Sequence, residues 1–112
     1  MVATEVGVQL VFDAQVLTPG RVTTLAGSTL SVVVLLIRSD GTTRRLVYPA
    51  TIGAQATILG TAYGTASYGS YITNGTEFPT AGVYEVQLLA SFNAGAQSYK
   101  SPPYVLNVDL AL

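Results

Sequence analysis

The residue types that most often carry enzyme chemistry are scarce in this chain of 112 residues. It contains no histidine and no cysteine, so nucleophile–base pairs built on those side chains, thiolate metal sites and disulfides are excluded. No Asp-x-Asp run indicates a calcium loop. The acidic residues are Glu5, Asp13, Asp40, Glu77, Glu85 and Asp109, and the three aspartates fall in different predicted elements.

Two of these acids, Glu77 and Glu85, flank a predicted backbone corner. A paired-carboxylate site needs its two groups about 5–9.5 Å apart, whereas the strand pattern turns Glu85 outward as a solvated side chain. The glycines between Gly60 and Gly69 lack the following helix or lysine of a phosphate-binding loop. We therefore predict no catalytic, metal or cofactor-binding residues, and a protein that is not an enzyme.

One segment has the composition of a recognition surface. Tyr63, Tyr68 and Tyr71 lie among glycine, serine, alanine and threonine, and such tyrosines offer large amphipathic contacts at low entropic cost. Two interpretations stay open. The tyrosines cap an edge of the fold, or they contact a neighbouring subunit or a surface glycan.

The low charge of the chain narrows its partners. Charged residues make up 10% of the sequence, against about 25% in an ordinary soluble domain. The net charge is −1 and no basic stripe is present, which argues against nucleic-acid binding. The longest apolar run, Val32 to Ile37, is too short to cross a membrane, and the first residues do not resemble a signal peptide. A surface with so few charges suits burial in a larger assembly.

The stretch from Phe78 to Phe92 is the clearest structural element. Pro79 and Gly82 favour a tight corner after Phe78. The following residues alternate with a period of two, which predicts a strand with one face on a core. The side chains predicted to face that core are Tyr84, Val86, Leu88, Ala90 and Phe92.

A second long strand is predicted from Ser28 to Ser39. Its centre is apolar on both faces and rich in β-branched residues, which favours strand over helix. An antiparallel strand with one solvated face should alternate. Either the domain covers both faces, or the outward set meets another subunit. That set is Val33, Leu35 and Ile37.

Turn residues divide the rest of the chain into short strands. The turns are expected at Leu17–Gly20, Ser39–Thr42, Asn74-Gly75 and Asn93–Ala96. The remaining extended segments are Glu5 to Val16, Arg21 to Leu25, Thr43 to Tyr48, Thr57 to Leu59, Thr65 to Thr73, and a last strand that starts at Gln97 and is interrupted by Pro102-Pro103. With no helical period, this pattern predicts one all-β sandwich domain spanning residues 1–112.

The segment Ala81–Val86 resembles the F strand of immunoglobulin-like sandwiches, in which a tyrosine bonds back to the corner backbone. Val86 stands where such domains often have a cysteine. The resemblance implies an immunoglobulin-like antiparallel β-sandwich of about seven strands, with Phe78, Gly82 and Tyr84 as its structural corner.

The order of turns and strands also resembles the small immunoglobulin-like domains of tailed-phage virion proteins. The N-terminal domain of baseplate upper proteins is the nearest, and head-decoration and neck proteins are similar. The corner Ala81–Tyr84 and the segment Lys100-Ser101-Pro102-Pro103 carry this resemblance. Such domains often precede a receptor-binding or trimerising region, and nothing follows Leu112 here. We therefore expect a decoration, adaptor or collar subunit.

The resemblance implies a structural protein of the phage particle, made in the host cytoplasm without a signal peptide. Its expected partners are other virion proteins of the capsid, neck or tail, in many copies, with no nucleic acid and no membrane insertion. The alternative is a free-standing module that binds carbohydrate or a cell-surface partner through Tyr63, Tyr68 and Tyr71. An accessory domain of an enzyme is a third possibility.

Overall fold

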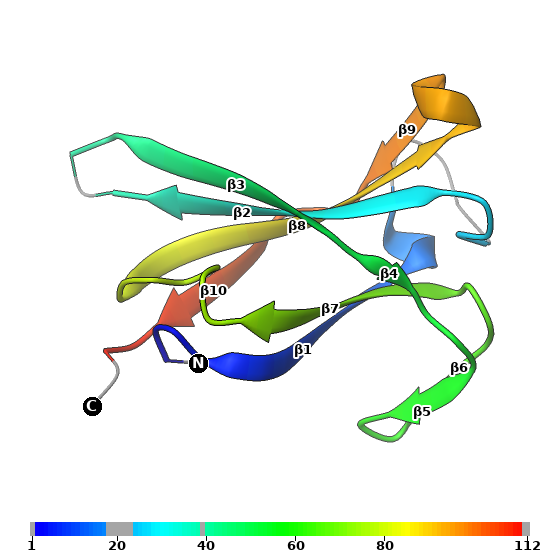
Figure 1. The fold of residues 1–112 in the computed structure, drawn as a ribbon, viewed down its shortest axis with the longest axis horizontal. Coiled ribbons are helices and arrows are strands. Elements are labelled where there is room, and N and C mark those ends of the chain that lie inside the picture. Colours follow the sequence, from blue (N-terminus) through cyan, green and yellow to red (C-terminus); the bar gives the residue numbers. More distant parts are fainter. Residues whose placement is uncertain (1, 18–23, 39, 111–112) are drawn as a thin grey trace.

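The computed structural model describes residues 2–17, 24–38 and 40–110, and they form two larger antiparallel sheets and a separate two-stranded hairpin. Figure 1 shows the larger sheet as the upper layer and the smaller one below it. The larger sheet has the order β10-β8-β2-β3, and β9 also pairs with β8. Its strands are β2 (Thr29–Ile37), β3 (Thr43–Pro49), β8 (Gly82–Phe92), β9 (Gln97–Lys100) and β10 (Tyr104–Val108).

The smaller sheet has the order β1-β7-β4. Its strands are β1 (Val6–Asp13), β4 (Thr51–Ile52) and β7 (Tyr68–Asn74). A separate hairpin of β5 (Ala56–Ile58) and β6 (Thr61–Tyr63) projects from the body beside this sheet (Figure 1). Short 3₁₀ turns follow β1 at Ala14–Val16 and β8 at Asn93–Gly95.

The predicted fold class, an all-β antiparallel sandwich, is confirmed. The sheet orders are those of the G-F-C-C′ and B-E-D strands of immunoglobulin domains, with β8 in the F position. The structure has ten strands among its described residues rather than about seven. The difference arises because β4, β5 and β6 are very short and because the last strand is split into β9 and β10.

The core lies between the sheets and is built mainly by β2 and β8. These two strands are paired with Val32 opposite Leu88, Val34 opposite Val86 and Leu36 opposite Tyr84. All six side chains are buried, and Phe12 and Tyr71 of the smaller sheet join the same cluster. Burial of each large side chain contributes roughly 1.5–3 kcal/mol before entropy is counted. The alternation predicted for β8 is thus observed.

The first strand is shorter than predicted. It ends at Asp13, whose carboxylate accepts a 2.9 Å bond from the Gln15 amide and starts the 3₁₀ turn. In the sequence Val6, Val8, Leu10 and Phe12 alternate with Gly7, Gln9 and Val11, which predicts that the even-numbered side chains face inward. Val6 is nevertheless exposed, because the β1–β7 register shifts between Val6 and Gln9. Gly7 lies within that irregularity with φ +84°. The odd–even alternation therefore holds only after the irregularity.

Most of the other predicted boundaries shift by a few residues. The turn between β2 and β3 forms as predicted, with Asp40 accepting two bonds from Thr42 and Gly41 at φ +86°. β7 begins at Tyr68 rather than Thr65. Most of the expected turn Leu17–Gly20 and of the extended segment Arg21 to Leu25 lies outside the described residues.

Candidate functional site

The corner before β8 forms as predicted. The Tyr84 hydroxyl donates a 2.7 Å hydrogen bond to the Thr80 carbonyl, and the Thr80 amide donates to the Tyr84 hydroxyl oxygen at 3.4 Å. Phe78 packs edge-on against the Tyr84 ring at 4.9 Å between centroids. Gly82 has φ +156°, which a residue with a side chain rarely adopts. The three corner residues thus serve the fold and leave no reactive group exposed.

The break at Pro102-Pro103 is bridged by Ser101. Its hydroxyl accepts a 2.9 Å bond from the Leu88 amide, and its own amide donates to the Leu88 carbonyl at 2.9 Å. Gln87 Nε2 also donates to the Ser101 carbonyl at 2.8 Å. Since neither proline can donate to the ladder, Ser101 satisfies β8 where the strand is split.

The rings of Tyr68 and Tyr71 are buried in the structure and do not form an exposed platform with Tyr63. Tyr68 lies over Gly53 and donates to the Ala54 carbonyl at 2.8 Å. The half-buried Tyr63 packs against Tyr68 with 4.8 Å between centroids. Tyr63 and Tyr68 thus pack against each other beside Gly53, and Tyr71 lies in the core.

Tyr71 belongs to a different cluster, which surrounds a buried acid. Its hydroxyl donates to a carboxylate oxygen of Glu77, a residue only 1% exposed. The Asn74 and Gly75 amides donate to the same carboxylate at 3.0 and 3.2 Å. The ring of Tyr48 lies 5.6 Å from that of Tyr71. The donors are the Tyr71 hydroxyl and two backbone amides, at the end of β7 and the start of the turn after it. Glu77 therefore stabilises that turn.

This arrangement shifts the pKa of both side chains. Burial alone would raise the pKa of Glu77, but the hydrogen bonds from Tyr71, Asn74 and Gly75 outweigh it and hold that pKa below its ordinary value. Burial, followed by the bond to Glu77, raises the pKa of the Tyr71 hydroxyl well above its usual range. Both shifts favour the state in which Glu77 is charged and Tyr71 is neutral. The pair is enclosed, which favours a structural role.

The surface with the clearest capacity for binding is the face of the larger sheet that points away from the core, here called the outer face. On β2, β3 and β8 it consists of Thr29, Ser31, Val33, Leu35, Ile37, Thr43, Arg45, Val47, Pro49, Val83, Glu85, Gln87, Leu89 and Ser91. Ile37, Val47 and Val83 are 43%, 50% and 45% exposed. Such a run of apolar side chains is unusual on the solvated side of an antiparallel sheet.

The predicted set Val33, Leu35 and Ile37 lies on this face, but its members differ in exposure. Val33 is buried, because Val47 and Gln87 flank it on the neighbouring strands. Leu35 is half-buried, and Ile37 is exposed. Of the three, only Leu35 and Ile37 can offer appreciable area to a partner. Strand alternation also predicts that Val47 and Val83 face outward, and both are exposed, but they were not among the predicted contact residues.

One row across the outer face carries opposite charges. The strand registers place Arg45 and Glu85 on the two sides of Leu35. Two residues further along, at the end of β2, Thr43 and Val83 flank Ile37 in the same way. The face thus has an apolar centre line along β2, with one positive and one negative group at the same level beside it.

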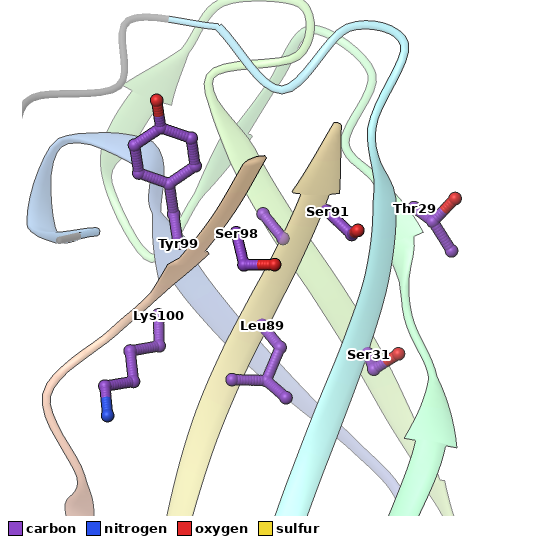
Figure 2. A pocket seen from close by; sticks show the side chains of 8 residues that line it. Thr29, Ser31, Leu89, Ser91, Ser98, Tyr99 and Lys100 are labelled. Atoms are coloured by element: carbon purple, nitrogen blue, oxygen red, sulfur yellow. The ribbon is translucent and has the colours of Figure 1, made fainter. Parts of the chain in front are cut away.

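At the end of the outer face where β2 begins, the surface forms a depression lined largely by hydroxyl side chains. This depression of about 440 Å³ is lined by residues of β2, β8 and β9. Figure 2 shows Leu89 and Lys100 at one end and the hydroxyl side chains of Thr29, Ser91 and Ser98 at the other. The hollow exists because small side chains occupy three adjacent strands. It contains no acid or amide of the kind that glycan sites use.

The described residues contain no group of three or more acidic side chains able to hold a metal ion. No helix in the same ranges has the length and apolar character needed to cross a bilayer. Comparison of the chain with protein-family models, with curated proteins and with solved structures finds no match in any of the three. Function must therefore be inferred from the chain's own residues.

Proposed function

We propose that this protein is a non-enzymatic structural subunit of a tailed-phage particle, packed among other virion proteins in many copies. The observation that carries the proposal is the apolar outer face, where Ile37 and Val83 lie side by side and exposed, and where Val47 is exposed four residues away along β2, beside Val33. In a chain with only 10% charged residues, such a face favours contact with protein over contact with water.

The phage assignment is supported by the resemblance of the Ala81–Tyr84 corner and the Lys100–Pro103 segment to immunoglobulin-like virion domains. Repetition would strengthen modest contacts, because many copies on a symmetric particle bind with high effective concentration. A carbohydrate-binding module is less well supported. Its aromatic platform requires exposed rings, whereas those of Tyr68 and Tyr71 are buried.

The test uses particles from which the protein has been stripped, to which purified protein is added back and sedimented with them. We expect saturable binding that is lost in the double variant Ile37→Ser/Val83→Ser. The matched control is Ile72→Ser, since Ile72 is also exposed but lies on β7 in the smaller sheet. A monomer that binds no part of any particle would contradict the proposal.

A further inference from the structure

We infer that the outer face pairs with the outer face of a second copy of this chain, about a two-fold axis parallel to β2. The inference deepens the proposed function. It rests on that function in one respect, because both require that protein covers the outer face. It specifies the occupant, the axis and the residues that meet.

The charges select this geometry. The proposed two-fold axis lies between the two stacked sheets and runs parallel to β2. It leaves each residue at the same height along the strands but exchanges the two sides of the sheet, so that β3 of one copy lies over β8 of the other. Arg45 on β3 then faces Glu85 on β8 of the other copy, and Glu85 faces the other Arg45. Leu35 meets Leu35 on the axis. Two opposite-charge pairs therefore flank one apolar contact.

A shift of the axis by half the spacing between strands removes this match. With the axis between β2 and β8, Glu85 would lie opposite Leu35 and Arg45 opposite Val105 of β10. Each charge would then be buried against an apolar side chain at a desolvation cost. The pattern of charges thus distinguishes the axis along β2 from its nearest alternative.

Sheet packing allows the pairing. Stacked sheets lie about 10 Å apart and cross at about 30°, so residues one strand from the axis are displaced by only about 2–3 Å. Arginine and glutamate side chains are long enough to absorb that displacement. Ile37 and Val83, with Thr43, extend the apolar contact toward one end of the strands.

The small contact area between the two outer faces predicts that the two copies associate weakly. Three overlapping strands of about seven residues cover roughly 14 Å by 24 Å, or about 340 Å² of projected area per copy. A stable protein pair buries about 800 Å² per partner. We therefore expect reversible self-association at high concentration, of the strength that an assembly with many copies can use.

A charge-exchange experiment tests the pairing by sedimentation equilibrium at about 0.05 M salt, where screening is weak. Arg45→Glu and Glu85→Arg should each raise the dissociation constant at least about tenfold, because like charges then meet twice. The double variant Arg45→Glu/Glu85→Arg restores opposite charges and should return the constant to within about threefold of the original.

Arg44→Glu is the matched control, because Arg44 lies next to Arg45 on β3 but pairs with the core residue Leu36 and faces the other way. It should leave the dissociation constant unchanged. Circular dichroism of every variant verifies that the sandwich is intact, and a variant that unfolds is replaced by its neutral counterpart, Arg45→Gln or Glu85→Gln, which should weaken pairing to a smaller extent.

Three results would overturn the inference: a wild-type protein that stays monomeric up to about 1 mM, single variants that pair normally, or a double variant that is not restored. Particle binding without self-association would remove the two-fold pair and leave the proposed function standing. Self-association without particle binding would contradict the proposed function and leave the two-fold pair standing.

Discussion

The hydroxyl of Tyr84 lies 2.7 Å from the carbonyl oxygen of Thr80, and this bond ties the first residues of β8 to the loop that delivers them. The phenol ring is fully buried between the sheets, while its hydroxyl reaches the rim. One side chain thus joins the core to the corner and sets the direction in which β8 enters its sheet.

Replacement of Tyr84 by Phe should lower the free energy of unfolding by about 1 kcal/mol, because the ring still packs but the bond to Thr80 is lost. Urea unfolding measures the change. Tyr104→Phe is the control, since Tyr104 is exposed on β10, and it should alter stability by less than about 0.5 kcal/mol. An unchanged midpoint for Tyr84→Phe would mean that the phenol merely packs.

Ser101→Ala should cost about 1–3 kcal/mol, more than an ordinary serine substitution, because it leaves the buried Leu88 amide without an acceptor. Ser98→Ala on the adjacent β9 is the matched control, since Ser98 is exposed. Both variants are compared by urea unfolding. Equal effects in the two would show that Ser101 does not complete the β8 ladder.

Glu77→Gln should lower stability at pH 7 by about 1.5–3 kcal/mol, because the charged acceptor of three hydrogen bonds is lost. The pKa of Glu77 is lowered in the folded protein, so its stabilisation is present above the unfolded-state pKa of about 4.3. That contribution disappears as the pH falls through the folded-state pKa.

The difference in stability between the wild type and Glu77→Gln should therefore narrow in acid, as followed by urea unfolding at a series of pH values. Asp109→Asn, at an exposed site after β10, is the control and should not reproduce this narrowing. The raised pKa of Tyr71 predicts a second pH dependence, on the alkaline side. The stabilisation that the neutral Tyr71 hydroxyl contributes is present below about pH 10 and is lost as the pH rises further. A pH-independent difference would contradict the assignment.

Gly53→Ala should destabilise the fold by about 1–3 kcal/mol, because a methyl group there would lie 2.1 Å from the Tyr68 ring, which is itself fixed by its bond to Ala54. Gly64→Ala is the control, since nothing lies within 4 Å of that position. It should be neutral or slightly stabilising. Thermal unfolding that ranks the two variants equally would show that the Tyr68 contact is not close.

Leu59→Asn should raise stability by about 0.5–1 kcal/mol. Leu59 is fully exposed at the tip of the β5–β6 hairpin and has φ +50°, followed by Gly60 at φ +82°. This is the backbone of a type I′ turn, for which Asn-Gly is the favoured pair. The prediction fails if thermal unfolding shows a loss of stability, which would indicate that the leucine packs against the body.

The sequence predicted best where the pattern was strong and local. The alternation in β8 identified Tyr84, Val86 and Leu88 as core residues, and Pro79 with Gly82 predicted the corner. The Asp40-Gly41 turn was equally clear, because its side-chain and backbone bonds form within a few residues.

The features that were missed depend on contacts that strand alternation does not encode, whether these contacts are near or far along the chain. The burial of Glu77 requires donors from β7 and from its own turn, which no local period encodes. Val47 and Val83 became a common surface only when β2 was placed between their strands. The segment from Thr51 to Asn74 was the least predictable, since its small residues and tyrosines alternate weakly.

Whether protein covers the outer face can be measured directly by methyl NMR with a soluble paramagnetic probe, which broadens the signals of exposed methyl groups. As the concentration rises, or as partner protein from the particle is added, the Ile37, Val47 and Val83 methyl signals should lose their broadening, while Ile72 on β7 stays accessible. Equal and constant broadening of all four under every condition would contradict the account.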